Sequence, residues 1–183
     1  MSTLHVENLK GLSSGGNANK IIVPSGQTLT APGHVIQVVS ASDSTAGNTT
    51  STSAIQAWAG TSITPKFSNS LIQIQCNFYA WHRDFYDGYI QLYKNGSAIS
   101  GQRIVIRNAS HPSSNFVAAG SRAGWYTPSW LWNFTEVAGG TSQLTYSVYA
   151  WTQNAGQPTY WNSSHSNNEV DPTSTMILTE IAQ

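Results

Sequence analysis

The chain has 183 residues, enough for one domain with a short appendage and too few for two domains of ordinary size. Charged residues make up 9% of it, where about 25% is usual for soluble domains, and the formal net charge is zero. This balance argues against a nucleic-acid-binding protein, which would carry a basic patch, and the 11% aromatic residues exclude a disordered chain.

The first 33 residues predict an extended arm without a core of its own. They contain no aromatic residue, and Gly-rich or Pro-containing breakers recur at 13–17, 24–26 and 32–33. Another surface is needed to bury the apolar side chains of this segment, which are Leu4, Val6, Leu9, Leu12, Ile21, Ile22 and Val23. We therefore expect 1–33 to be a docking or oligomerisation arm and 34–183 to be a separate β domain.

From residue 34 onward the hydrophobic pattern repeats every two residues, which predicts β-strands. The clearest strand is 71–81, in which one face carries Ile72, Ile74, Cys76, Phe78 and Ala80. Seven further strands are predicted at 35–41, 54–63, 88–94, 97–107, 129–137, 143–151 and 175–181. Eight antiparallel strands predict an all-β fold, an antiparallel β-sandwich of the jelly-roll type.

Two pairs of turn residues predict hairpins. Asn95-Gly96 suits the two positive φ angles of a type I′ turn, so 88–94 and 97–107 should pair. Gly139-Gly140 should turn 129–137 into 143–151 in the same manner.

Two long segments, 108–128 and 152–172, do not fit the strand pattern and are expected to be loops, where binding sites concentrate. An exposed ring flanked by amides suits sugar recognition, because the ring covers sugar C–H groups and the amides bond to hydroxyls. The candidate glycan or host contacts are Trp125, Tyr126, Tyr160, Trp161, Asn167 and Asn168. Capping the sandwich end, or packing against another subunit, is the alternative for the aromatic residues among them.

The other tryptophans are expected to pack in the core or at a subunit interface. Trp130, Trp132 and Phe134 share one face of a strand and should belong to the core. Trp58, Trp81 and Trp151 lie in strands or at their ends and are assigned to the core or to a subunit interface.

No catalytic or metal-binding constellation is found in the sequence. Asp84 and Asp87 are the closest carboxylates, as a glycan hydrolase would need, but they fit ordinary turn chemistry. The five histidines are too widely spread to form a recognised ligand pair. We expect a protein that is not an enzyme, binds no cofactor or metal, and buries its single Cys76 as a small hydrophobe.

No apolar run approaches the roughly 18 residues of a membrane helix. Residues 1–10 alternate polar and apolar side chains and lack the apolar centre of a signal peptide. These features predict a chain made as a soluble cytoplasmic protein, with no membrane insertion.

Four segments resemble virion proteins of marine tailed phages, namely tail-fibre-like or appendage proteins of phages of cyanobacteria and other aquatic bacteria. They are Ser2-Thr3-Leu4-x-Val6-x-x-Leu9, IVPSGQTLTAPGHVIQV at 22–38, SITPKFSNS at 62–70 and EIAQ at 180–183. The resemblance implies a structural component of the virion that docks on other virion proteins through its N-terminal segment. It also implies a β domain presented outward, often as a homotrimer, and it brings no catalytic residue with it.

Three other functions stay open at the level of sequence. A capsid decoration or head-appendage protein would use its arm to dock on the shell. A freestanding carbohydrate-binding lectin would bind sugar without residues 1–33, and a glycan hydrolase would depend on Asp84 or Asp87.

Overall fold

The computed structural model describes residues 13–15, 31–82, 86–107, 129–163 and 172–183. The chain divides into two units, Met1–Ala31 and Pro32–Gln183, and the boundary falls two residues before the expected end of the arm. The seven candidate docking residues, Leu4, Val6, Leu9, Leu12, Ile21, Ile22 and Val23, lie outside the described residues, so their role stays a prediction. In the described part of the chain, no helix has the length and apolar character needed to cross a membrane.

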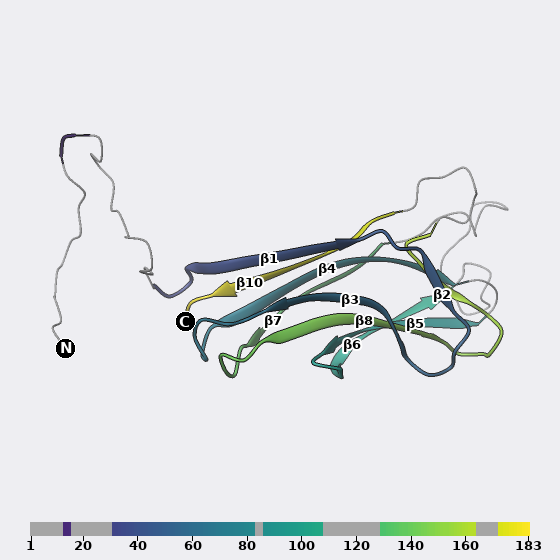
Figure 1. Ribbon diagram of the computed structural model, residues 1–183. Coiled ribbons are helices and arrows are strands. Elements are labelled where there is room, and N and C mark those ends of the chain that lie inside the picture. The colour runs from purple at the N-terminus through teal and green to yellow at the C-terminus, as the bar shows by residue number, and fades with distance from the viewer. Residues whose placement is uncertain (1–12, 16–30, 83–85, 108–128, 164–171) are drawn as a thin grey trace. The chain divides into compact units, whose positions relative to one another are not determined.

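The second unit is a sandwich of two antiparallel sheets (Figure 1). The first sheet contains β1 (Val35–Asp43), β10 (Ser174–Ile181), β4 (Leu71–His82), β9 (Thr159–Trp161) and β2 (Gly47–Thr49) in that order, with β7 (Ser129–Val137) also paired to β4. The second sheet has the order β3 (Ile55–Ile63), β8 (Leu144–Thr152), β5 (Asp87–Lys94) and β6 (Ser97–Arg107). The predicted all-β sandwich is confirmed.

The strand order is that of a jelly roll. When the eight long strands are numbered along the chain, the first sheet follows the order 1-8-3-6 and the second sheet 2-7-4-5. Each sheet therefore mixes early and late strands, which is the arrangement produced by two interlocked Greek keys.

The eight predicted strands correspond to the eight long strands, with ends that differ by two residues at most. β2 and β9 were not predicted, because three residues are too few to display a period of two. The Asn95-Gly96 hairpin is confirmed: φ is 49° at Asn95 and 76° at Gly96, and Lys94 pairs with Ser97.

The second predicted hairpin, at Gly139-Gly140, is wrong. β7 pairs with β4 in the first sheet, whereas β8 pairs with β3 and β5 in the second, so the connection crosses from one sheet to the other. Gly139 does turn the chain, with φ of 71°. The turn is nevertheless held by the loop between β3 and β4, since the N–H groups of Ala138 and Gly139 donate to the carbonyls of Ser70 and Ser68.

The core lies between the sheets, as the alternation predicted. All five inward residues predicted on β4, from Ile72 to Ala80, are fully buried, and they face the buried Ile90, Leu92 and Val148 of the second sheet. The assignments of Trp58 and Trp132 to the core are confirmed, and Trp130 and Phe134 pack against it. Burial also raises the pKa of the Cys76 thiol to about 12, which fits a structural cysteine rather than a reactive one.

One acidic side chain, Glu180 of β10, lies fully buried in this interior. Its Oε1 accepts hydrogen bonds from the Ser70 hydroxyl at 2.6 Å and from the N–H groups of Lys66 at 2.8 Å and Phe67 at 3.2 Å. Its Oε2 accepts a further bond from Gln37 Nε2 at 2.6 Å. Burial by itself would raise the pKa of Glu180, but the hydrogen bonds to Ser70, Gln37 and the two N–H groups outweigh it and lower the pKa.

The sandwich has two ends that carry different features. At the proximal end, Gly33 and His34 pair with Ala182 through hydrogen bonds of 2.8 Å, so the start of this unit lies beside the C-terminus. At the distal end, β1, β4, β6 and β8 finish while β5, β7 and β10 begin. The sandwich thus begins and ends at its proximal end.

Candidate functional site

The distal end gathers the stems of three segments of the chain. The described residues flanking 83–85, 108–128 and 164–171 are the ends or beginnings of β4, β5, β6, β7, β9 and β10. The strand register brings these stems together, since Asp87 pairs with Arg107, Tyr79 with Ser129, and His82 with Thr159. Both long segments that the sequence predicts as loops start from this end.

The sequence-predicted contacts fall into two groups. Trp125, Tyr126, Asn167 and Asn168 lie outside the described residues, and their role stays a prediction. Tyr160 and Trp161 are described, and both belong to β9 rather than to a loop.

Tyr160 is a half-buried ring at the distal end. It stacks on Trp81, with ring centroids 4.2 Å apart and planes 9° from parallel. The indole Nε1 of Trp81 donates to the Ser163 carbonyl at 3.0 Å, which fixes the orientation of the pair. The stack forms a preordered aromatic surface on the outer face of the first sheet.

Trp161 does not present an exposed ring, contrary to the expectation for a glycan contact. It is 7% exposed and belongs to the hydrophobic core. Because β9 is a strand, Tyr160 and Trp161 point to opposite faces. The indole lies so close to Gly47 of β2 that a Cβ added there would come within 2.5 Å of it.

Asn162 pins the base of the segment that separates β9 from β10. Its φ of 46° is unusual for a residue other than glycine, but asparagine tolerates it. Its amide donates to the Asp43 carbonyl at 3.0 Å and carboxylate at 3.2 Å, and its side-chain oxygen accepts a bond from Ser174. We call Asn162 and Ser174 the clamp. The backbone of Tyr79 bonds to both residues, because its carbonyl accepts from the Asn162 N–H and its N–H donates to the Ser174 hydroxyl. Both stems of 163–173 are therefore fixed to one edge of β4.

Replacing Asn162 with alanine should lower the free energy of unfolding by about 2 kcal/mol, because several buried polar groups lose their partners together. Urea unfolding followed by tryptophan fluorescence measures the change. Asn48→Ala is the matched control, since the Asn48 side chain is exposed on β2, and it should change stability by less than about 0.5 kcal/mol. Equal losses for the two variants would contradict the clamp.

A second set of buried polar residues, Thr159 and His82, lies in the interior at the distal end. The Thr159 hydroxyl donates to the Trp151 carbonyl at 3.1 Å and lies 3.0 Å from His82 Nδ1. Because a hydroxyl has one proton, this arrangement makes His82 Nδ1–H the donor to Thr159. A Cβ at Gly88 would lie 2.7 Å from the same hydroxyl, so β5 packs directly against this pair.

The second sheet carries an aromatic surface that the sequence reasoning missed. On its outer face Tyr93 stacks on Tyr149 with centroids 3.9 Å apart, and Tyr89 stacks on Trp151 at 5.3 Å. The guanidinium of Arg103 lies 5.6 Å from the Tyr89 ring centroid. The signal was present in β5 and β8, where inward aliphatic residues alternate with outward aromatic ones.

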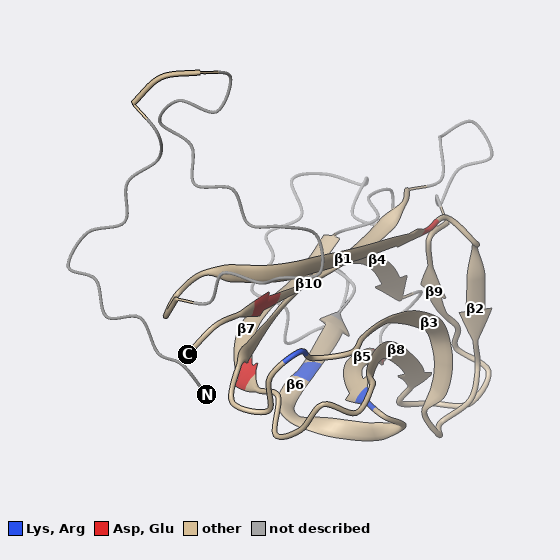
Figure 2. Ribbon diagram, turned by 60° about the vertical axis from the view of Figure 1, so that its left-hand side comes forward, with Lys and Arg blue, Asp and Glu red and all other residues tan. Residues whose placement is uncertain are grey.

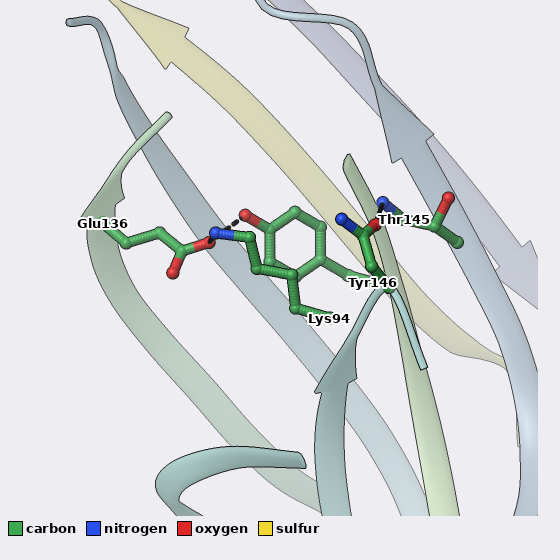
Figure 3. A network of polar contacts seen from close by, with 5 residues as sticks. Lys94, Glu136, Thr145 and Tyr146 are labelled. Carbon is green, nitrogen blue, oxygen red and sulfur yellow. Dashed lines mark hydrogen bonds and ion pairs between the residues drawn. The ribbon is translucent and has the colours of Figure 1, made fainter. Parts of the chain in front are cut away.

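The proximal end holds a polar cluster that joins the two sheets (Figure 3). The Tyr146 hydroxyl donates to Glu136 Oε1, and Lys94 Nζ lies 2.8 Å from the same oxygen. Burial, reinforced by the hydrogen bond and the charge of Glu136, raises the pKa of Tyr146. Asn95 Oδ1 accepts the Thr145 N–H at 2.8 Å and completes the link between strands. These contacts stabilise the sandwich.

Within the described ranges, no group of three or more His, Cys, Asp or Glu side chains could hold a metal ion. Of the two carboxylates considered for a hydrolase, Asp87 is buried and Asp84 lies outside the described residues. The arrangement of the described distal end is suited to binding through the Trp81–Tyr160 surface.

No protein-family model and no curated protein match the chain. Among solved structures, one described as Bacillus endospore appendages forming disulfide-linked pili aligns with 87% of this chain and 100% of that chain, at 12% identity and a TM-score of 0.35. Dimeric latent PorU from Porphyromonas gingivalis aligns with 91% of this chain, which spans 15% of that chain, at 9% identity and a TM-score of 0.34. Likenesses at these TM-scores carry no argument about function.

Proposed function

We propose that the chain is a non-enzymatic structural protein of a bacteriophage virion, a tail-fibre or appendage component. It docks on other virion proteins through residues 1–33 and exposes its β-sandwich for attachment to glycans of the host surface. The resemblance of the segments at 2–9, 22–38, 62–70 and 180–183 to such proteins is what suggests the phage setting.

The observation that supports this proposal best is the polarity of the sandwich. The described chain enters the sandwich at the proximal end, at Gly33 and His34, while the stems of 83–85, 108–128 and 164–171 gather at the distal end. A component that is attached at one end and binds a host surface at the other needs its two ends to differ in this way. The jelly-roll fold also recurs in viral capsid and lectin domains, which is an argument by analogy.

The chemistry of the distal end favours a neutral glycan as the ligand. The Trp81–Tyr160 stack offers apolar ring surface beside polar backbone groups, the combination that binds sugar C–H groups and hydroxyls. A chain with 9% charged residues and no net charge would bind such a ligand with little dependence on salt.

Labelling of intact particles tests the virion part of the proposal. Antibodies against the sandwich, viewed by electron microscopy, should decorate the tail or its fibres. Decoration of the head instead would identify a capsid decoration or head-appendage protein, and absence from purified particles would contradict a virion role. Sugar binding by a protein absent from particles would indicate a freestanding lectin.

Removal of the Tyr160 ring tests the glycan part. On a glycan array the whole protein should bind a subset of neutral sugars, and Tyr160→Ala should weaken that binding at least tenfold, because a stacked ring supplies much of the apolar contact. Phe67→Ala is the matched control: this aromatic residue is 36% exposed and lies at the proximal end, so binding should be unchanged. An array without signal for the whole protein, or equal binding by Tyr160→Ala, would remove the adhesive role.

A further inference from the structure

The outer face of the first sheet is free of charge across its four long strands. The outward positions of β1, β10, β4 and β7 carry hydroxyl, amide, aliphatic and aromatic side chains only. We call the outward residues of Val38–Ser42, Leu71–Tyr79, Ser129–Val137 and Thr175–Ile181 the neutral face, which stops short of the Trp81–Tyr160 stack at the distal end.

The acidic residues of these strands all point away from this face. Glu180 is buried between the sheets, Glu136 bonds to the inward Tyr146, and Asp43 bonds to Asn162 at the distal end. Charged residues are correspondingly few along this sheet (Figure 2). Charge depletion over a whole face is a feature of protein–protein interfaces, because charges are costly to remove from water.

Several large apolar side chains project from the neutral face. The exposed fractions are 58% for Val38, 66% for Leu131, 56% for Val137 and 38% for Ile177. These residues come from three different strands, β1, β7 and β10, so the apolar groups span the face from one edge to the other. Exposed apolar residues gathered on one face mark interaction surfaces in soluble proteins.

Amide side chains fill the centre of the face. The cross-strand row Ser40, Ile177, Gln75, Asn133 runs beside the row Val38, Thr179, Gln73, Thr135. Gln73 Nε2 lies 3.5 Å from Asn133 Oδ1 across β4 and β7. Each amide is both a donor and an acceptor, so the same row on another copy can satisfy it without any charged group.

We propose that the neutral face is the surface through which copies of this chain pack against one another. A charged partner would bury its charges against a face that offers no opposite charge, whereas a second copy brings none. The outer face of the second sheet differs in this respect, because it carries the exposed Arg103. The proposal holds whichever particle the chain belongs to, and it assigns self-association to the sandwich rather than to residues 1–33.

Sedimentation equilibrium of the full chain tests this assignment. The wild-type protein should be an oligomer at micromolar concentration, and Leu131→Lys should raise its dissociation constant at least tenfold, since lysine places a charge in the buried contact. Thr135→Lys, at another exposed position of β7, is a second variant that removes no apolar side chain and should act in the same direction.

Gln56→Lys is the matched control, because it adds the same charge at an exposed position of β3 in the second sheet. It should leave the oligomer unchanged, and circular dichroism confirms that all three variants are folded. A wild-type chain that stays monomeric up to roughly 100 µM would overturn the proposal. So would folded lysine variants that associate as the wild type does, which would assign self-association to residues 1–33 or to another surface.

Discussion

Replacing Glu180 with glutamine should lower the free energy of unfolding by about 3 kcal/mol at neutral pH. The carboxylate is fully buried and accepts four hydrogen bonds, from Ser70, Gln37 and the N–H groups of Lys66 and Phe67. A glutamine keeps the shape but has one acceptor oxygen, and its NH₂ group would face donors. The loss should therefore include unpaired buried groups as well as the lost charge.

The pH dependence of the free energy of unfolding gives a second, independent test of the role of Glu180. The pKa of Glu180 is lowered from its ordinary value of 4.5 in the folded protein, so the folded state holds fewer protons than the unfolded state in this range. The stabilisation is thus complete above about pH 4.5 and is lost as the pH falls through the folded pKa. The stability difference between wild type and Glu180→Gln should shrink over the same range, as measured by urea unfolding at stepped pH.

Glu136→Gln is the matched control for this prediction. Its carboxylate also bonds to a buried hydroxyl, that of Tyr146, but its side chain is 24% exposed and water can replace part of the contact. We expect a loss of about 1 kcal/mol. If Glu180→Gln were no more destabilising than Glu136→Gln, the buried carboxylate would not be what holds 66–70 onto β10.

The alternation of side chains was enough to predict the long strands and the direction of their faces. In β4, twelve residues of regular alternation identify both the strand and its buried side. The pairing of strands could not be predicted in this way. Gly139 turns the chain as expected, but whether β7 then joins β8 or β4 depends on how the sheets pack, which no local pattern encodes.

The candidate site was predictable only in part, for a related reason. Tyr160 and Trp161 were read as neighbouring loop residues, whereas β9 sends one to the surface and the other into the core. A strand of three residues gives no periodic signal, so this split could not be foreseen. Glu180 was equally hidden, because its partner Ser70 lies 110 residues away in the sequence.

Replacing Gly60 with alanine should be the most damaging single methyl addition in the described part of the sandwich, with a loss of about 4 kcal/mol or failure to fold. Gly60 lies in an irregular stretch of β3, where the pairing with β8 shifts between Trp58 and Thr61. Its φ is 69°, and an added Cβ would lie 1.9 Å from the carbonyl oxygen of Tyr146. Because that oxygen belongs to the backbone of β8, a side-chain rotation cannot relieve the clash.

Gly96→Ala separates the two causes. Gly96 has a similar φ of 76°, but no atom lies within 4 Å of the position an added Cβ would take. Gly96→Ala should therefore lower the free energy of unfolding by only about 1 kcal/mol, the cost of placing a side chain at a positive φ. The difference between the two variants measures the clash between β3 and β8. Thermal unfolding followed by circular dichroism gives both values. Equal losses at Gly60 and Gly96 would mean that β3 can move away from β8 at low cost, and the close approach of the two strands would then not be a fixed feature of the second sheet.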